Sequence, residues 1–427
     1  MTNAAGVADV AVIGLGYIGL PTAAVLARAG LDVIGVDRLR ERVEAVNRGE
    51  LPFLEDGLAT VLAEQVDAGR LRAQTVTPSA RTYVIAVPTP LTREGNTADL
   101  SLVEAATRQI APCLTGDELI VLESTCPPGT TRALAEALIS MRPDLSLDGS
   151  GGRHRVHVAH CPERVLPGRI MTEMVTNSRV IGGLTSEASH LARDLYATFC
   201  RGELVLTDAT TAEMTKLTEN SFRDLNIAFA NELALVCDRA GVDVWELIDL
   251  ANRHPRVSIL HPGPGVGGHC IAVDPWFLVS SAPEETRLIR TARQVNDSRP
   301  AYYVGRILQT VEGLVSPTVA VLGLTFKANV DDLRQSPALA ITEQVAAGAP
   351  HAQVLVAEPR ADALPPSLAR WANVRLTGCR QAVERADVVV VLVSHQEFSD
   401  LDPLLLKGRT VIDATGLWSR RSPRLAG

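Results

Sequence analysis

The chain has 427 residues, 46% of them hydrophobic and 21% charged, a composition typical of a globular protein long enough for two or three domains. Its formal net charge of −8 argues against a nucleic-acid partner, because it offers no diffuse basic surface to a phosphate backbone. No apolar run reaches the roughly 18 to 20 residues of a membrane span, and the first residues lack the basic segment of a signal peptide. We therefore expect a cytoplasmic protein with no membrane partner.

The seven cysteines are scattered along the chain and include no CxxC pair. Their odd number and the lack of an export signal make structural disulfides unexpected. A histidine precedes a cysteine twice, at His160-Cys161 and His269-Cys270. Adjacent residues on an extended chain point to opposite sides, so each pair provides one zinc ligand more easily than two. We therefore expect no bound metal.

The first segment has the pattern of a strand, a glycine turn, a helix and a second strand. The strand in "DVAVIGLGYIGL" (9–20) runs into Gly14, Gly16 and Gly19, and the strand "LDVIGVD" ends at Asp37. The glycines let the backbone approach a pyrophosphate at the helix N-terminus, and Asp37 can accept hydrogen bonds from a ribose diol. The pattern predicts a dinucleotide site. A carboxylate repels a 2′-phosphate, so NAD is favoured, although the two arginines that soon follow Asp37 keep NADP as the alternative.

Three further strand patterns follow at 82–90, 118–125 and 156–163, each ending in small or polar residues. Such strand ends line the crevice in which open parallel sheets bind ligands. We therefore expect residues 1–205 to form an N-terminal NAD-binding Rossmann domain.

The next region is predicted to be helical. Apolar residues recur along 207–241 at steps of three, four or eight, which indicates a long amphipathic helix; they are Met214, Leu217, Leu225, Phe229, Leu233 and Val236. More helix is expected up to about residue 313, with an interruption by proline and glycine over 254–268. We expect 206–313 to be a central dimerisation region and the protein to be a homodimer through the long helix.

A second α/β pattern has strands expected at 318–326, 352–359, 386–395 and 408–416. It keeps only Gly323 of a glycine fingerprint, so we expect a Rossmann-like domain that does not bind a dinucleotide. The predicted fold class is therefore α/β. Two Rossmann-like doubly wound domains, the second at 314–427, are joined by a long central helix.

Lys216 and Asn220 lie four residues apart on the long predicted helix, on one face with the small Ala212. A solvated polar stripe is the ordinary explanation of such a pair. An ammonium and an amide also suit the stabilisation of a developing alkoxide, and KxxxN after a dinucleotide domain is the polar pair of the β-hydroxyacid dehydrogenases. The pair therefore favours alcohol oxidation.

Cys270 lies in "GPGVGGHCIAVDP" (263–275), after a run in which four of six residues are glycine and four residues before Asp274. A free cysteine is ordinarily a small buried hydrophobe, but the glycines here allow a ligand to approach closely. A thiolate at this position can trap an aldehyde as a thiohemiacetal, and a second hydride transfer gives a thioester. Asp274 or Glu163 can orient or deprotonate the water that cleaves it, which leaves a carboxylate.

Six segments resemble a known family in order and spacing. They are "GLGYIGLP", "ESTCPPGTT" (123–131), "CPERVLPGRIM" (161–171), "EMTKLTENSFRDLNIAFANELA" (213–234), "GPGVGGHCIAVDPWF" (263–277) and "GLTFKANVDDLRQSPA" (323–338). They resemble the UDP-glucose / UDP-N-acetylmannosamine 6-dehydrogenase family over nearly the whole chain. The resemblance implies oxidation of a nucleotide sugar's C6 alcohol to a uronate, with two NAD+ consumed. It also implies an N-terminal NAD domain, a helical dimerisation region and a C-terminal domain that helps hold the UDP.

The resemblance also assigns roles by position. Cys270 corresponds to the nucleophile, and Lys216 and Asn220 to the groups that stabilise the alkoxide and the oxyanion. The water is handled by Asp274, Thr125 and Glu163, while the first proton goes to Lys216, to Asp274 or to a water. The residues expected to contact NAD are Gly14, Gly16, Tyr17, Ile18, Gly19, Asp37, Pro88, Thr89, Thr125 and Arg334. The residues expected to contact the UDP-sugar are Glu163, Arg164, Val165, Lys216, Asn220, Arg253, Arg256, Gly263, Gly267, Lys327 and Arg409.

One departure from the family pattern bears on the sugar. The UDP-glucose enzymes resemble "NPEFLxEG" where this chain has "CPERVLPG", so Pro167 replaces a carboxylate and Arg164 a bulky apolar residue. This variant, with "RHPR" and "HCIAVDPWF", is most similar to the UDP-N-acetylmannosamine dehydrogenases. The expected substrate is a UDP-N-acetylhexosamine, UDP-ManNAc first, with UDP-glucose or UDP-GlcNAc in second place. The sequence is also compatible with a single-step β-hydroxyacid-type dehydrogenase in which Cys270 is passive, or with a non-catalytic nucleotide-sugar binding protein.

Overall fold

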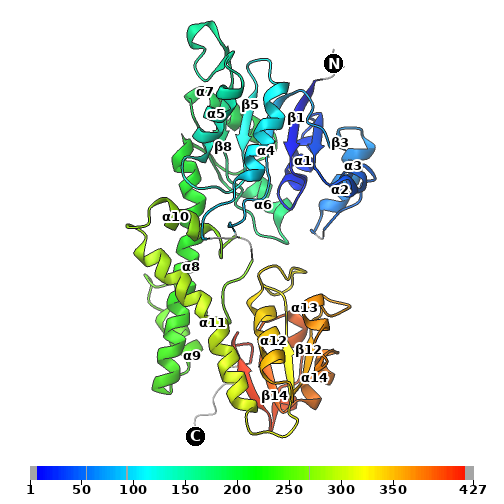
Figure 1. Cartoon of the computed structure of the whole chain (residues 1–427), viewed down its shortest axis with the longest axis vertical. Coiled ribbons are helices and arrows are strands. Elements are labelled where there is room, and N and C mark those ends of the chain that lie inside the picture. The colour runs from blue at the N-terminus through cyan, green and yellow to red at the C-terminus, as the bar shows by residue number, and fades with distance from the viewer. Residues whose placement is uncertain (1–6, 54, 93–94, 269, 419–427) are drawn as a thin grey trace. The chain divides into compact units, whose positions relative to one another are not determined.

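The computed structural model describes residues 7–53, 55–92, 95–268 and 270–418 (Figure 1). The chain divides into two compact units, residues 1–219 with 276–283, and residues 220–275 with 284–427. The long helix α8 (Ala209–Ala240) contributes residues to both units. The division into three domains at 205 and 313 stays a prediction, and the strand β10 (Leu204–Asp208) continues past the first of these boundaries.

The first unit contains an eight-stranded sheet of order β10-β9-β8-β5-β4-β1-β2-β3. All neighbours are parallel except β8 and β9, which pair antiparallel. The order reverses between β1 and β4, which makes this the point where such sheets bind ligands. The strands are β1 (Ala8–Ile13), β2 (Val33–Val36), β3 (Leu71–Gln74), β4 (Ala80–Ile85), β5 (Leu119–Leu122), β8 (His157–His160), β9 (Arg179–Gly183) and β10. A separate small sheet pairs β6 (Leu145–Ser146) with β7 (His154–Arg155).

Helices cover both faces of this sheet, which explains why its central strands are apolar along their whole length. In β1, Val10 and Val12 pack into one hydrophobic cluster, while Ala11 and Ile13 pack into the cluster on the opposite face. The covering helices are α1 (Gly19–Arg28), α2 (Arg40–Asn47), α3 (Leu58–Asp67), α4 (Ser101–Ile110), α5 (Thr130–Met141), α6 (Ile170–Thr176) and α7 (Ser186–Ala197).

The second unit contains a five-stranded parallel sheet of order β13-β12-β11-β14-β15. Its strand order also reverses once, between β11 and β14. Two doubly wound α/β sheets in one chain confirm the predicted fold class. The strands are β11 (Thr318–Leu322), β12 (Gln353–Ala357), β13 (Val374–Leu376), β14 (Val388–Val391) and β15 (Thr410–Asp413). The helices beside them are α12 (Pro337–Gly348), α13 (Pro366–Ala369), α14 (Cys379–Arg385) and α15 (Gln396–Ser399).

The helical part of the second unit combines the C-terminal part of α8 with α9 (Val244–Ala251) and α11 (Arg287–Val311). Helix α10 (Asp274–Ser281) begins in this unit. Asp224 of α8 accepts hydrogen bonds from Arg293 Nη1 and Asn296 Nδ2 of α11, at 2.5 and 2.8 Å, in the buried seam between the two helices. Burial raises the pKa of Asp224 in spite of this arginine. The seam therefore depends on matched polar groups as well as on apolar packing.

The predicted apolar stripe of α8 is only partly buried: Met214, Phe229 and Val236 are exposed, whereas Leu217 is buried. Phe222, which the prediction did not include, lies seven residues before Phe229, and Phe222, Phe229 and Val236 are 68, 50 and 59% exposed. A row of large apolar side chains at this spacing follows one face of a helix and is typical of a helix-to-helix interface. Among the described residues, none of the helices has the length and apolar character needed to cross a bilayer.

Candidate active site

The turn after β1 has the geometry of a dinucleotide site. Gly14 has φ +95°, and a Cβ there would lie 2.6 Å from the Ala86 carbonyl oxygen, so only glycine fits. Asp37 Oδ2 accepts from the backbone N–H of Leu15 at 3.0 Å, which ties the turn to the end of β2. A Cβ on Gly16 would meet nothing within 4 Å. This open side of the turn, at the start of α1, is a cradle for a pyrophosphate.

Asp37 is 7% exposed, and Arg42 Nη1 donates to its Oδ2 at 2.9 Å. Arg42 itself is half-buried, so this contact is less confined than the one from Leu15. The arginine that the structure places on the carboxylate is thus not one of the two that directly follow it in sequence, Arg38 and Arg40, which are exposed. A carboxylate at this position fits the ribose diol of NAD.

Other residues expected near NAD lie on the loops after β1, β4 and β5, three adjacent strands of the sheet. Tyr17 stacks on Phe53 with ring centroids 4.2 Å apart. Thr89 Oγ1 donates to the carbonyl oxygen of Thr125 at 2.6 Å, which ties the loops after β4 and β5 together. Pro88 precedes Thr89 on the first of these loops. The structure therefore brings these expected residues to the switch point of the first sheet.

Glu163 is held by a buried arginine that the sequence did not single out. Arg179 Nη2 donates to Glu163 Oε2 at 2.8 Å, and its Nη1 lies 3.7 Å from Glu123 Oε1. The pKa of Glu123 is raised to about 7, mainly by burial and secondly by the charge of Glu163. Thr22 and Tyr196 donate hydrogen bonds to the Glu123 carboxylate. The Glu163 carboxylate is thus paired and fixed in direction, as a group that orients a water must be.

Arg164 is anchored on the long helix. Its Nε donates to Glu219 Oε2 at 3.0 Å, and its Nη2 donates to Glu219 Oε1, so the contact is bidentate. Glu219 directly precedes Asn220 on α8. Val165 is half-buried and packs against the core of the first unit. The loop 162–168, expected to contact the sugar, therefore has a fixed attachment to α8.

Lys216 is half-buried on α8 and lies one turn before Asn220, as the predicted spacing requires. Three residues earlier on the helix, Glu213 accepts hydrogen bonds at the N-terminus of α5, from the backbone N–H groups of Gly129 and Thr131 at 2.6 and 2.7 Å. This contact holds α8 against the loop that follows β5. The buried carboxylate of Glu213 therefore joins the helix that carries Lys216 to the loop that carries Thr125.

Cys270, Asp274 and Asn220 form one group in the second unit. The carbonyl oxygen of Cys270 accepts from the backbone N–H groups of Val273 and Asp274 at 3.0 and 2.8 Å, which places the cysteine in the turn just before α10. Asn220 Nδ2 donates to Asp274 Oδ2 at 2.5 Å. Cys270 is exposed and Asp274 is buried. An accessible thiol thus lies in a turn whose carboxylate is oriented by the predicted asparagine.

The glycine run before Cys270 is packed rather than loose. Gly263 donates to Asn231 Oδ1 at 2.9 Å, and its carbonyl oxygen accepts from Arg299 Nε at 3.3 Å. A Cβ on Gly267 would lie 2.5 Å from Pro337 Cδ, and Gly268 has φ +80°. Ligand approach was the reason expected for these glycines, but Gly267 and Gly268 are also required for packing on the loops of the C-terminal sheet.

A pocket lies at the switch point of the second sheet, where the residues after β11 and β14 meet the glycine run. Lys327, Ser394 and Thr415 provide its polar lining, and Pro264 and Phe326 its apolar lining. Carboxyl ends of parallel strands at a switch point are the usual place for a nucleotide. Lys327 and Gly263, both expected at the substrate, are therefore in or next to this pocket.

The turn after β11 repeats the one after β1. Gly323 has φ +91°, and Glu358, after β12, accepts from the backbone N–H of Leu324 at 2.7 Å. Here the buried His395 lies 3.3 Å from Glu358 Oε2 and accepts at Nδ1 from the backbone N–H of Asn329. Burial raises the pKa of Glu358, but hydrogen bonds from His395 and Leu324 outweigh this and lower the pKa overall. His395 thus occupies the space beside Glu358 where a ribose would have to bind, which agrees with a domain that does not bind a dinucleotide.

The remaining predicted arginines have other surroundings. Arg253 and Arg256 are exposed, and Arg334 Nε donates to Asp332 Oδ1 at 2.9 Å. Arg409 donates to the backbone carbonyl oxygens of Leu405 and Glu384 at 2.5 and 2.7 Å, an arrangement that explains this residue without a ligand.

A crevice shaped for a dinucleotide and a second pocket with a lysine at a sheet's switch point are typical of an oxidoreductase that acts on a nucleotide-linked substrate. Residues 8–200 match the NAD binding domain of the UDP-glucose/GDP-mannose dehydrogenase family, 210–298 its central domain and 320–420 its UDP binding domain. The chain belongs to this family. It is an NAD-dependent nucleotide-sugar dehydrogenase, which confirms the predicted enzyme class and cofactor.

Several known proteins resemble the chain over nearly its whole length. It is 52% identical to the NDP-N-acetyl-D-galactosaminuronic acid dehydrogenase of Ralstonia nicotianae, over 96% of each chain. It is 49% identical to the UDP-N-acetyl-D-mannosamine dehydrogenase of Escherichia coli K12, over 96% of this chain and 99% of that one. The solved structure of the UDP-D-ManNAc dehydrogenase of Pyrococcus horikoshii is 39% identical, covers 96% of each chain and has a TM-score of 0.84.

Proposed function

We propose that the protein oxidises the C6 alcohol of a UDP-N-acetylhexosamine, UDP-ManNAc first, to the uronate in two NAD-dependent steps. The relatives named for N-acetylmannosamine and N-acetylgalactosaminuronic acid both support an acetamido sugar. The observation that carries the chemistry is the group of three in the second unit, an exposed Cys270 in a turn whose Asp274 is oriented by Asn220. UDP-glucose and UDP-GlcNAc are the alternatives that the same group can serve.

In the first step the C6 hydroxyl loses its proton and the carbon loses a hydride, which gives an aldehyde. Bound NAD supplies the chemistry of accepting one hydride in each oxidation. The Lys216 ammonium stabilises the alkoxide as its proton leaves. Asn220 has two amide N–H donors, of which one is directed to Asp274, so the second is available to an oxygen of the substrate.

In the second step the Cys270 thiolate adds to the aldehyde carbon, so that a C–S bond forms and the oxygen takes up a proton. Loss of that proton and of a second hydride gives the thioester. Water then adds to the thioester carbon, the C–S bond breaks, and the carboxylate and the thiol are released. Asp274, Thr125 and Glu163 are the groups that we assign to this water, because the two carboxylates are buried and fixed by hydrogen bonds.

The UDP is assigned to the pocket of the second sheet. Lys327 brings a positive charge to this pocket, and the backbone at its rim includes Gly265 with φ +140°. A lysine ammonium suits the diphosphate, because the diphosphate is negatively charged and stays so during both oxidation steps. Gly263 and Gly267 belong to the glycine run beside this pocket. Arg253, Arg256 and Arg409 are assigned to the substrate only by their positions in the sequence.

The test is an NADH assay with purified protein and a panel of UDP-ManNAc, UDP-GlcNAc, UDP-GalNAc and UDP-glucose. We expect two NADH and one carboxylate for each sugar. One NADH with release of an aldehyde or ketone would support a single-step dehydrogenase instead. Cys270→Ser is expected to abolish the second oxidation, and Cys113→Ser, which changes a half-buried thiol with no assigned role, is the matched control. Full activity of Cys270→Ser would refute the thioester.

We also propose that the protein is a homodimer through α8. The exposed row Phe222, Phe229 and Val236 supports this, because water would otherwise face three large apolar side chains on one helix. Light scattering is expected to give twice the chain mass, and Phe229→Lys to shift the protein towards the monomer. A monomer at micromolar concentration would refute the proposal.

A further inference from the structure

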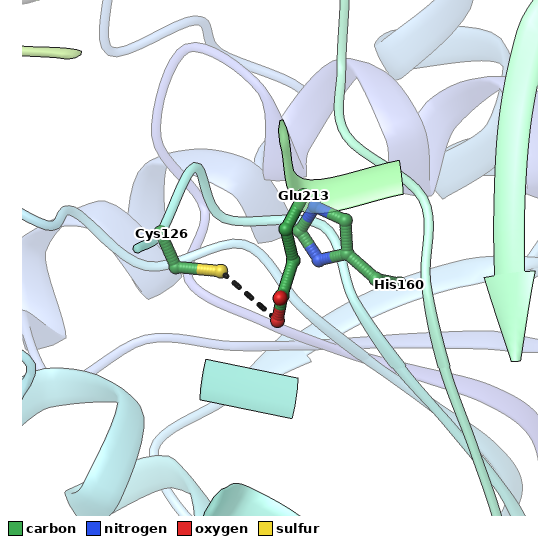
Figure 2. A group of neighbouring side chains, drawn as sticks. All are labelled: Cys126, His160 and Glu213. Carbon is green, nitrogen blue, oxygen red and sulfur yellow. Dashed lines mark hydrogen bonds between the residues drawn. The ribbon is translucent and has the colours of Figure 1, made fainter. Parts of the chain in front are cut away.

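Three segments of the first unit bring a sulfur, a nitrogen and an oxygen ligand to one buried point. Figure 2 shows Cys126 from the loop after β5, His160 at the end of β8 and Glu213 in the second turn of α8. Their exposed fractions are 1, 0 and 1%. The three potential ligand atoms all lie within 4.8 Å of one another. None of the roles assigned to the dehydrogenase reaction uses these side chains.

His160 supplies a second, independent observation. Both of its ring nitrogens are buried and make no hydrogen bond within the described part of the chain. Nearly all buried polar groups have a partner, so a histidine with neither nitrogen paired calls for a ligand or another explanation. An imidazole nitrogen is a common metal ligand, so a metal ion is one partner that would satisfy the ring.

Glu213 is already oriented for coordination. Its carboxylate accepts from the backbone N–H and hydroxyl of Thr131 at 2.7 and 2.6 Å and from the N–H of Gly129 at 2.6 Å. The Cys126 thiol donates to Glu213 Oε1 at 3.8 Å. Bond lengths of about 2.3 Å to sulfur and 2.1 Å to oxygen place two ligands of a tetrahedral zinc about 3.6 Å apart. Hydrogen bonds to a ligating carboxylate are the usual second layer of such sites.

We propose that Cys126, His160 and Glu213 bind one zinc or chemically similar divalent transition-metal ion. The ion takes the place of the thiol proton that Cys126 donates to Glu213, and this proton is released to solvent. A thiolate and a carboxylate neutralise the two charges of the ion, so the buried site carries no net charge. A water completes the four ligands. This differs from the expectation of no metal, which considered only adjacent residues; Cys161, beside His160, lies instead near Arg179.

The site has a structural role. Cys126 directly follows Thr125, and Glu213 precedes Lys216 by three residues. The ion therefore ties the loop after β5 to α8, and so holds two groups of the proposed dehydrogenase in place. Because the site is buried, metal exchange is expected to be slow, and loading needs long incubation or metal present during expression.

The experiment measures metal without measuring activity. The full chain with Cys270→Ser, which removes the exposed thiol as a competing ligand, is treated with EDTA, incubated with Zn²⁺ or Co²⁺ and desalted. We expect about one retained metal per chain by elemental analysis, a thiolate-to-cobalt charge-transfer band, and an unfolding temperature at least about 2 °C above that of the EDTA-treated protein. The same measurements are made on Cys126→Ser, His160→Gln and the control His157→Gln in that background.

Cys126→Ser keeps a hydroxyl donor to Glu213, so it is expected to fold and to lose both the metal and the cobalt band. His160→Gln should do the same, whereas His157→Gln, on the same strand, should bind as its parent does. No retained metal, or equal metal in Cys126→Ser and its parent, would overturn the proposal. NADH production plays no part in these outcomes, so they are separate from the fate of the proposed function.

Discussion

Glu123→Gln is expected to change how the stability of the protein depends on pH. In the folded chain burial first, and then the charge of Glu163, raises the pKa of Glu123 to about 7, against 4.5 for an ordinary glutamate. The folded state therefore keeps a proton that the unfolded chain loses between these two values. The stability contributed by this proton is fully present below about pH 4.5, falls as the pH rises towards 7, and is absent above it.

The size of the effect follows from the two pKa values. They differ by about 2.5 units, and each unit is worth 1.36 kcal/mol, so the wild-type protein should lose about 3 kcal/mol across this window. Glutamine has nearly the same shape and does not ionise. The amide still accepts a hydrogen bond from Thr22 or Tyr196, and Arg179 keeps Glu163 as its partner. The variant should therefore lose the slope and should be the more stable protein at about pH 8.

The assay is calorimetric unfolding of the full chain at intervals between about pH 5 and 8, with the shift of the transition converted to free energy. Glu136→Gln, which changes an exposed glutamate of the same unit, is the control and should follow the wild type. If Glu123→Gln keeps the wild-type slope, the carboxyl is ionised throughout and the reasoning from burial is wrong.

Three further outcomes are expected. Gly267→Ala should lower stability by about 1 to 3 kcal/mol, since its Cβ would lie 2.5 Å from Pro337 Cδ; thermal unfolding checks this. Asp37→Ala should raise the KM for NAD by about 10-fold or more and lower the preference of the enzyme for NAD over NADP. Titrations with each cofactor measure both effects, and an unchanged KM for NAD would contradict the assignment. Glu219→Gln should raise the KM for the sugar several-fold with kcat little changed, because Arg164 loses a bidentate partner that is partly exposed to solvent; steady-state kinetics with the sugar varied measure both constants.

The fold was predictable because its signals are local. Parallel strands covered on both faces are apolar runs, and the turn that contains Gly14 and Gly16 has a spacing that few other structures require. The strands β9 and β10 were not predicted separately. Their sequences, "RVIGG" and "LVLTD", are short, and two glycines make the first resemble a turn. Only β10 is at the edge of the sheet, where it is partly exposed and burial imposes little pattern, whereas β9 is internal and mostly buried.

The site was predictable to the extent that its residues occur in one motif. Cys270 and Asp274 share a turn, and Lys216 and Asn220 share a helical face, so spacing alone relates them. Arg179, the first residue of β9, lies 16 residues from Glu163 in the loop after β8, and no spacing rule joins them. Asn220 and Asp274 are 54 residues apart, and their hydrogen bond depends on the packing of α8 against the start of α10. Such contacts are set by tertiary packing, which one sequence does not display.

The repeated glycine turn has a consequence for inhibitors. Both copies direct a backbone N–H to a carboxylate after the next strand, at Asp37 in one and Glu358 in the other. The first carboxylate is covered by the half-buried Arg42, which can swing into solvent, whereas the second is covered by the fully buried His395. An adenosine-based compound that binds the first crevice should therefore find the matching position of the second already filled. Compounds built on adenosine are therefore expected to discriminate between the two crevices.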